Sequence, residues 1–388
     1  MQNFLIVVVM LLLNVSAVAA RPAEPIIQAD SAILIEAGTG RVIYEKNADQ
    51  VRPPASMTKM MTCILGLEQL PRNTLIPLSN AAIYAEDNSF KWAPGDVIQA
   101  DELLLGMMMV SDNGAAIAVA QTVAGSVPQF ASMMNEKAAE IGCTNTNFVN
   151  PNGLPNRNHY STARDMAKIA MYGMKMPEFR KMVSTIEYPI RWASPSNKID
   201  VAITTNEMLE YYSGMNGIKT GWTNAAGGCF AGSAMRGNTE FIVIIMHSPD
   251  TQTRFDDTAK LLDYGFEVVK MTKVLNKDRV SKIVFVENGV QATVHVRPLE
   301  DLNFPLFEGE DTKKLKIVYE LPKTVEAPIK EGKTLGYVRL KYDGEVVASI
   351  PMIAEESVER GFSFLSKLVG LVAPVITIAQ SMFGAFFA

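Results

Sequence analysis

Three short motifs, each present once in the 388-residue chain, carry polar side chains suited to nucleophilic chemistry. The first is Ser-x-x-Lys, formed by Ser56 and Lys59, which follows Pro53 and Pro54 and precedes an apolar stretch. This context predicts a helix N-terminus, where residues three apart share one face, so Lys59 can reach the Ser56 hydroxyl. A lysine is normally protonated at neutral pH, but burial and the helix dipole both lower its pKa. The motif therefore offers a nucleophile together with a base.

The second motif is Ser111, Asp112 and Asn113, the only Ser-x-Asn in the chain. It follows the very apolar stretch 103–110 and precedes Gly114 and an alanine-rich segment. A polar triplet between two buried apolar stretches needs hydrogen-bond partners. The pattern therefore indicates either a satisfied helix break or a hydroxyl and an amide presented to a cleft.

The third motif is Lys219, Thr220 and Gly221, the only Lys-Thr-Gly, on a candidate strand at 217–222. Gly221 would let a ligand approach the strand backbone closely. Lys219 would add positive charge near an anionic substrate and further depress the pKa of Lys59. Each motif also has an ordinary interpretation: a helix cap with a surface lysine, a satisfied helix break, or a strand with an exposed lysine.

The elements that must position these motifs predict an α+β domain. Strands are expected at both ends with helices between them, which favours one antiparallel sheet closed by distant segments. The expected strands are 32–36 and 41–45, around the hairpin Gly38 to Gly40, and 217–222, 228–235 and 241–247; the expected helices are about 56–70, 101–122, 128–142, 163–174 and 251–270.

A change in composition near residue 274 predicts a second domain. Residues 21–273 hold 18 of the 22 methionines, and charged residues rise from 48 of 253 there to 28 of the next 87. The second domain, 274–356, is expected to be a small β-sandwich with strands at 280–286, 292–296, 315–320, 335–342 and 346–353. Asp343-Gly344 between the last two is a strong hairpin signal. His295, alone on a strand, is interpreted as structural.

Both ends of the chain suggest export and membrane attachment. Residues 1–20 combine an apolar run of about ten residues with small residues near Ala20, which is typical of a cleaved signal peptide; an uncleaved anchor is the alternative. In 357–388, apolar residues recur at helical spacing and no charge follows Lys367. We expect an amphipathic helix lying in the membrane interface. A spanning helix and a buried core helix are the alternatives, and Pro374 would kink either membrane form.

Composition excludes several other classes. With 48% apolar residues and a net charge of −5, the chain is neither disordered nor typical of a nucleic-acid binder. Three cysteines are too few for a disulfide scaffold and are wrongly spaced for a zinc site. We predict neither a metal nor a cofactor. Cys63, seven residues after Ser56, is interpreted as core packing.

The three motifs, in this order and separated by about 50 and 105 residues, resemble those of the penicillin-interacting serine enzymes. That group includes penicillin-binding proteins and serine β-lactamases. Further stretches resemble the low-molecular-mass D-alanyl-D-alanine carboxypeptidases, and so does the plan of signal, catalytic domain, β domain and amphipathic anchor. These stretches are 32–47, 148–154, 161–167 and 217–223.

This resemblance implies a penicillin-binding-protein-like fold and a role for each motif. Ser56 would attack the carbonyl between the two terminal D-alanines of a peptidoglycan stem peptide, and Lys59 would take its proton. D-Alanine would leave, protonated through Ser111, and water would hydrolyse the acyl-enzyme. Asn113 would hydrogen-bond the substrate amide, and β-lactams would acylate the same serine. The implied location is the periplasmic face of the cytoplasmic membrane.

The resemblance also implies a carboxylate site and an oxyanion hole. Thr220 and Lys219 would bind the terminal carboxylate, and Arg254 matches an arginine that the family uses near that group. The backbone N–H groups of Ser56 and Trp222 would form the oxyanion hole, where preorganised donors lower the barrier most.

Three positions depart from the family pattern. Asp112 stands where many relatives have glycine, Trp222 where close relatives have histidine, and Thr205 where an arginine is common. These departures leave the substrate contacts and the deacylation rate open, although the acylation motifs are complete.

Four other functions are alternatives to the carboxypeptidase. A class A-like β-lactamase needs a carboxylate after the second motif, and residues 141–164 contain none. A catalytically weak wall-binding scaffold and a strict endopeptidase remain alternatives. A Ser-His-Asp hydrolase is disfavoured because the chain has three histidines and no Gly-x-Ser-x-Gly.

Overall fold

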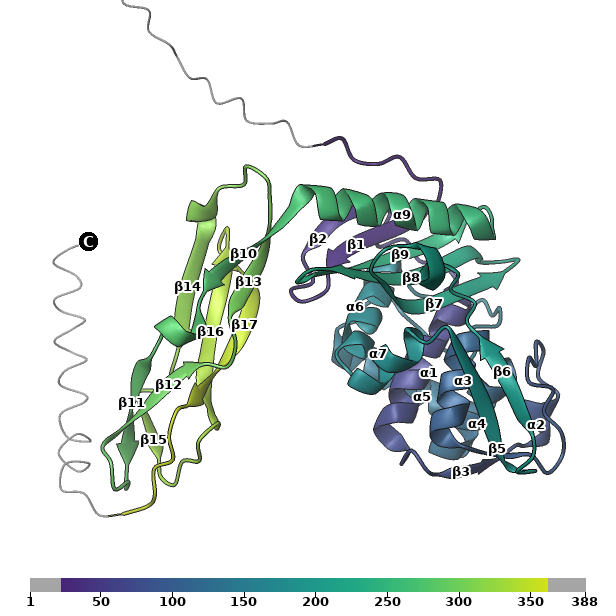
Figure 1. The fold of residues 1–388 in the computed structure, drawn as a ribbon, viewed down its shortest axis with the longest axis horizontal. Helices are drawn as coiled ribbons and strands as arrows, with labels where there is room; N and C mark the ends of the chain where they lie inside the picture. The colour runs from purple at the N-terminus through teal and green to yellow at the C-terminus, as the bar shows by residue number, and fades with distance from the viewer. Residues whose placement is uncertain (1–21, 362–388) are drawn as a thin grey trace, which may run out of the picture.

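The computed structural model describes residues 22–361, which form two domains (Figure 1). The first is built on a five-stranded antiparallel sheet in the order β2-β1-β9-β8-β7. N-terminal strands pair with strands about 200 residues later, so the expected closure by distant segments is confirmed. The strands are β1 (Ser31–Glu36), β2 (Val42–Lys46), β7 (Met215–Thr223), β8 (Gly227–Arg236) and β9 (Thr239–Ser248).

Helices cover both faces of this sheet. Helix α9 (Thr251–Val268) lies on one face, and α6 and α7 contact the other (Figure 1). Because strand side chains alternate, β9 places Phe241 and Val243 in the core under α9, and Ile242 and Ile244 in the opposite core. The α-helices of the first domain besides α9 are α1 (Lys59–Gln69), α2 (Asn80–Ile83), α3 (Ala100–Val110), α4 (Asn113–Ala124), α5 (Val127–Ile141), α6 (Ala163–Met174), α7 (Pro177–Val183) and α8 (Met208–Tyr211).

The helix expected over 101–122 is wrong as a single element, because α3 and α4 are separate. Ser111 has φ 64°, in the left-handed region that ends a helix. Asp112 then caps α4 by accepting a hydrogen bond from the Ala115 amide at 2.6 Å. The polar triplet 111–113 therefore forms the helix break that the sequence allowed, although the apolar residues on both sides favoured one continuous helix.

A second, four-stranded sheet in the first domain was not expected from the sequence. Its order is β3-β4-β5-β6, and β5 and β6 form an antiparallel hairpin near the lower edge of the domain (Figure 1). These strands are short or largely exposed, and their hydropathy pattern is weak. They are β3 (Leu75–Pro77), β4 (Val97–Gln99), β5 (Glu187–Ser194) and β6 (Ile199–Ile203).

The second domain consists of strands around its own apolar core, as expected. A six-stranded sheet has the order β14-β16-β17-β12-β11-β15, and β10 pairs with β13 in a separate ribbon. Asp343 and Gly344 both have positive φ in the predicted hairpin turn. The strands are β10 (Val269–Leu275), β11 (Lys282–Glu287), β12 (Thr293–Pro298), β13 (Leu302–Phe307), β14 (Leu315–Glu320), β15 (Thr324–Glu326), β16 (Thr334–Tyr342) and β17 (Glu345–Ala354).

The limits of the second domain lie slightly outside the range 274–356. Helix α9 leads directly into β10, so residue 274 falls inside a strand that pairs with β13. At the other end, Val358 pairs with Ile329 and Arg360 with Gly289. The predicted signal peptide and most of the predicted anchor lie outside the described residues. Within 22–361, no helix is both long enough and apolar enough to cross a membrane.

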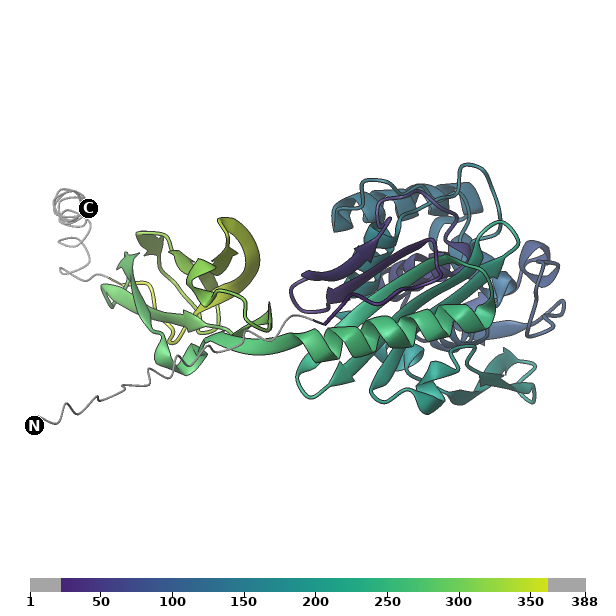
Figure 2. The ribbon, with the colours of Figure 1, turned by 90° about the horizontal axis from the view of Figure 1, so that it is seen from above.

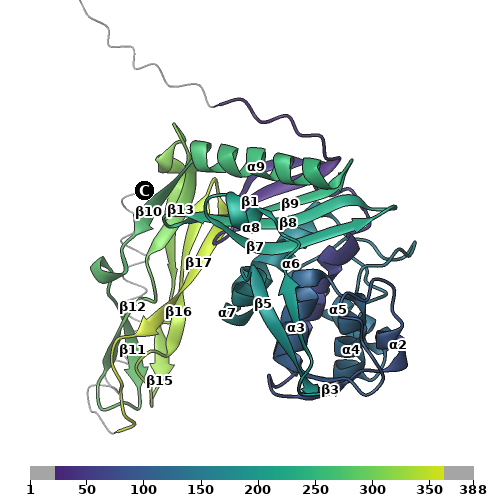
Figure 3. The ribbon, with the colours of Figure 1, turned by 45° about the vertical axis from the view of Figure 1, so that its right-hand side comes forward.

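The second domain lies beyond the C-terminal end of α9 (Figures 2 and 3). Arg41, in the turn between β1 and β2, reaches across the junction between the domains. It pairs with Glu310, donates to the Pro305 carbonyl, and lies 4.9 Å from the ring centres of Phe304 and Phe307. This single side chain thus joins one domain to a charged and aromatic pocket of the other.

Candidate active site

The Ser-x-x-Lys motif lies where it was expected, at the start of a helix. A 3-10 turn over Ala55–Thr58 leads into α1, so Ser56 and Lys59 are one turn apart. Lys59 Nζ lies 2.9 Å from Ser56 Oγ and is completely shielded from water. The nucleophile and base suggested by spacing alone are therefore in direct contact.

Lys59 is surrounded by neutral hydrogen-bond acceptors. Besides Ser56 Oγ, its amine contacts Asn113 Oδ1 at 2.7 Å and the Asn152 carbonyl at 2.8 Å. Burial lowers the pKa of Lys59 to about 7, while Asp112 and Asp87 act in the opposite direction. Near neutral pH, much of the population therefore carries a free amine that can accept a proton.

In the second motif, Asn113 contacts Lys59, whereas Asp112 has a structural role. The side chain of Asn113 links Lys59 to the Glu86 carbonyl, to which its Nδ2 donates at 2.9 Å. Asp112 faces the interior, where it caps α4 and accepts from the Trp92 indole at 2.9 Å. Ser111 is partly exposed, and its hydroxyl contacts neither Ser56 nor Lys59 among the described hydrogen bonds.

Two glycines enclose the turn that carries the nucleophile. A Cβ added to Gly221 on β7 would lie 3.0 Å from the Ser56 backbone nitrogen. A Cβ added to Gly153 would lie 1.9 Å from the Ala55 carbonyl oxygen. Ala55 itself has φ 49°, which is uncommon for a residue with a side chain. The backbone before Ser56 is thus held in an unusual conformation by close contact on both sides.

The third motif supplies charge and hydroxyl groups beside this turn. Lys219 is buried, and its Nζ donates to the Thr220 carbonyl at 3.0 Å. Burial, followed by the positive charges of Lys59 and Arg254, holds the pKa of Lys219 well below its usual value. The Thr220 hydroxyl lies 2.6 Å from the Thr205 hydroxyl. An incoming carboxylate would compensate the charge of protonated Lys219.

Arg254 and Trp222 differ in exposure near the end of β7, the strand to which Trp222 belongs. Arg254 is buried, and its Nη1 donates to the Gly221 carbonyl at 2.9 Å, so it supports the strand from within. Trp222 is 45% exposed at the rim. All nine residues singled out from the sequence are therefore described, but Arg254 is held by backbone rather than open to solvent.

Sequence reasoning missed two contributors. The Asn152 carbonyl is a backbone atom, so no side-chain pattern points to its contact with Lys59. Its loop does carry a turn signal, because Asn150, Pro151, Asn152 and Gly153 follow one another. Thr205 was noted only as a departure from the family pattern, and its contact with Thr220 joins segments 15 residues apart.

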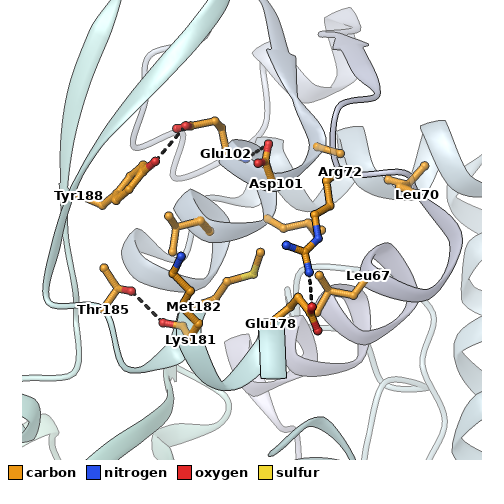
Figure 4. A pocket seen from close by; sticks show the side chains of 13 residues that line it. Leu67, Leu70, Arg72, Asp101, Glu102, Glu178, Lys181, Met182, Thr185 and Tyr188 are labelled. Carbon is orange, nitrogen blue, oxygen red and sulfur yellow. Dashed lines mark hydrogen bonds and ion pairs between the residues drawn. The ribbon is translucent and has the colours of Figure 1, made fainter. Parts of the chain in front are cut away.

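A separate cavity lies at the opposite ends of α1 and α3 from Ser56 and Ser111 (Figure 4). Its floor is apolar, and Arg72 pairs with Glu178 at its rim. None of the nine candidate side chains lines it, so it plays no part in the site described above.

The antiparallel sheet, the buried Ser-x-x-Lys turn and the Lys-Thr-Gly strand beside it define a penicillin-interacting serine enzyme. Residues 18–250 match the peptidase S11 family model, described as D-alanyl-D-alanine carboxypeptidase. Residues 270–360 match the penicillin-binding protein 5 C-terminal domain. The chain therefore belongs to the S11 family of D-alanyl-D-alanine carboxypeptidases.

Relatives resemble nearly the whole chain. The D-alanyl-D-alanine carboxypeptidase DacF of Bacillus subtilis is 33% identical over 357 residues, covering 90% of this chain and 91% of its own. Escherichia coli DacC is 30% identical, covering 88% of this chain and 86% of its own. The solved structure of penicillin-binding protein 5 from Haemophilus influenzae is 28% identical with a TM-score of 0.68, covering 87% of this chain and 99% of its own.

Proposed function

We propose that this chain removes the terminal D-alanine from peptidoglycan stem peptides through an acyl-enzyme on Ser56. The observation that carries the proposal is the buried Lys59 amine, 2.9 Å from Ser56 Oγ and bonded only to neutral acceptors. Ser56 Oγ attacks the carbonyl between the two D-alanines while Lys59 accepts its proton. The C–N bond then breaks, and the leaving amine takes a proton relayed through Ser111. Water hydrolyses the ester and regenerates Ser56.

The remaining residues bind and orient the substrate. Lys219 and Thr220 hold the terminal carboxylate, and the free N–H of the Asn113 amide donates to the substrate backbone. The backbone N–H groups of Ser56 and Trp222 form the oxyanion hole. The close contact between Gly221 and the Ser56 nitrogen supports this assignment, because it brings the two backbones together.

Arg254 contributes through position and charge. Its bond to the Gly221 carbonyl braces the backbone beside the oxyanion hole, and its charge favours an anionic substrate terminus. Removal of this charge should therefore affect substrates with a free carboxylate most.

The proposed location follows from family membership in a cell-wall enzyme class. Residues 1–20 act as the export signal, and 362–388, the part of the expected anchor that follows the strand pairings of the second domain, attach the enzyme to the periplasmic face of the cytoplasmic membrane. β-Lactams then act as covalent inhibitors on Ser56. Release of an active soluble enzyme after deletion of 362–388 would support the anchor, whereas continued sedimentation with membranes would contradict it.

The deciding experiment measures D-alanine release from a stem pentapeptide by the full chain and its Ser56→Ala variant. Release by the unaltered chain alone, with a penicillin adduct located on Ser56 by mass spectrometry, supports the proposal. A stable adduct without D-alanine release favours an endopeptidase or a scaffold. Rapid penicillin turnover without a lasting adduct favours a β-lactamase.

A further inference from the structure

His159 is a buried histidine that belongs to none of the three motifs. It is 2% exposed and sits against the Phe148 ring, with centroids 5.6 Å apart. Its Nδ1 lies 3.1 Å from the Val149 backbone nitrogen, and its Nε2 lies 2.8 Å from Thr58 Oγ1. Burial lowers the pKa of His159 to about 4, so the ring is neutral near pH 7. It therefore connects the loop after α5 to the turn that carries Ser56.

The direction of these hydrogen bonds is fixed by their ends. The Val149 N–H can only donate, so Nδ1 of His159 must accept and carry no proton. A neutral ring then has its proton on Nε2, which donates to Thr58 Oγ1. The Thr58 hydroxyl in turn donates to the Ala55 carbonyl at 2.8 Å. Three hydrogen bonds thus link Val149, His159, Thr58 and the Ala55 carbonyl, each donated in the direction of Ala55. Every donor and acceptor in this series has a partner.

This series of hydrogen bonds ends at Ala55, the residue with positive φ immediately before Ser56. Ala55 has φ 49°, and its carbonyl also lies against Gly153 of the loop that His159 anchors. The carbonyl of Asn152 in the same loop accepts from Lys59. Both the Ser56 backbone and one partner of Lys59 are therefore fixed to the same imidazole, although His159 itself touches neither Ser56 nor Lys59 in the described contacts.

We propose that His159, as the neutral Nε2–H tautomer, is a positioning residue for acylation that sets Ser56 relative to Lys59 through Thr58. This inference rests on the proposed roles of Ser56 and Lys59. It assigns a function to a group outside the motifs and predicts a defect in the acylation step itself. Misplacement of reacting groups by about 1 Å costs about 100-fold in rate.

The test measures acylation of the full chain by a fluorescent penicillin, separating the dissociation constant of the initial complex from the acylation rate constant. His159→Phe keeps an aromatic ring without either hydrogen bond, and Thr58→Val removes the hydroxyl at nearly constant volume. We expect each to lower the acylation rate constant about 10- to 100-fold, with the dissociation constant unchanged. The double variant should be acylated no more slowly than the slower single variant, since both substitutions interrupt the same series of hydrogen bonds.

A conservative variant and a control separate positioning from folding. His159→Gln can still donate to Thr58 and should retain more activity than His159→Phe. Phe148→Leu loses the ring contact while its backbone bonds to Asn135 remain, and it should acylate at the normal rate. Each rate is divided by the concentration of sites that penicillin can label at saturation, so that unfolded protein does not lower the apparent rate.

Two results would overturn the inference. One is an acylation rate constant for Thr58→Val equal to that of the unaltered chain. The other is an additive loss in the Thr58 and His159 double variant. If the unaltered chain is not acylated on Ser56 at all, the proposed function fails instead, and the Ser56→Ala comparison separates the two failures.

Discussion

The candidate active site and the junction between the domains both contain buried or half-buried basic side chains, but these have different partners. In the candidate active site, Lys59 Nζ contacts a hydroxyl, an amide oxygen and a carbonyl, and Lys219 Nζ contacts a carbonyl. Neither lysine is among the described ion pairs. At the junction, Arg41 has the Glu310 carboxylate and the faces of aromatic rings.

These partners determine whether the charge persists. A buried amine without a carboxylate loses its proton readily, which suits a general base. A guanidinium stays charged at neutral pH. Burial raises the pKa of its partner Glu310, but hydrogen bonds from Arg41 and Tyr342 outweigh burial and hold that pKa below its usual value. The pKa values of Lys59 and Lys219 are therefore lowered where no carboxylate pairs with them, whereas Arg41 keeps its charge beside Glu310.

The largest expected effect comes from Lys59→Met. Loss of the base should lower D-alanine release by about 10³-fold or more. The variant should also be more stable at pH 7, because burial lowers the pKa of Lys59 from 10.5 to about 7, and each unit corresponds to about 1.4 kcal/mol. We expect a gain of about 2–4 kcal/mol in the free energy of unfolding, measured with urea.

Lys198→Met is the matched control for that prediction. Lys198 lies 2.6 Å from the buried Asp96 carboxylate, so its removal leaves a buried charge unpaired and should destabilise the protein. Release of D-alanine should persist in the folded fraction. If both lysine variants shift stability in the same direction, the contrast between neutral and charged partners is wrong.

The pH dependence of acylation should follow Lys59. Only the free amine accepts the Ser56 proton, so the rate should fall about tenfold per unit below pH 7 and level off above it. Lys59 binds its proton less tightly in the folded state, so its contribution to stability should rise with pH between about 7 and 10.5. An acylation rate that stays constant from pH 5 to 8 would exclude Lys59 as a base with this pKa.

Local patterns explain why much of this site could be predicted from sequence. Ser56 and Lys59 are three residues apart at the start of a helix, so spacing alone suggests their contact. Lys219 to Gly221 were expected on a strand, and they lie on β7. The fold class also follows from strands at both ends of the first domain. Burial of Lys59, on which its pKa depends, is left open by the sequence, because a helix cap with a surface lysine fits the same motif; the structure buries the side chain completely.

Backbone partners and long-range contacts could not be predicted in the same way. The Asn152 carbonyl contacts Lys59 through a backbone atom, and 93 residues separate the two. Arg41 and Glu310 are 269 residues apart in the sequence. The hairpin sequence around Arg41 contains no pattern that predicts an ion pair with the second domain. The polar triplet 111–113 allowed a helix break, but the left-handed backbone of Ser111 that makes the break has no sequence signal of its own.

A smaller effect is expected from Thr205→Val. The Thr205 hydroxyl orients that of Thr220, so its loss should weaken one hydrogen bond to the substrate carboxylate, at about 1 kcal/mol. We expect KM for the pentapeptide to rise about fivefold with kcat nearly unchanged. A peptide with a C-terminal amide lacks the carboxylate and should not distinguish the variants. An equal loss with both peptides would contradict this role.

The smallest effect on chemistry, and the sharpest test of the comparison, comes from Arg41→Met. Release of D-alanine from a soluble pentapeptide should stay within about twofold, because Arg41 lies at the junction and contacts none of the site residues. Small-angle scattering should nevertheless show a broader range of domain orientations. Arg339→Met is the control, since Arg339 pairs with Glu320 within the second domain.

A junction held by Arg41 predicts that only Arg41→Met changes the scattering. If both arginine variants leave it unchanged, the direct passage of α9 into β10 is enough to fix the domains. If Arg41→Met instead lowers kcat/KM for D-alanine release as much as Thr205→Val does, the junction and the candidate active site are coupled through the first sheet. Because β1 and β2 flank Arg41 and β1 pairs with β9, such coupling would have to pass through three strands before reaching β7.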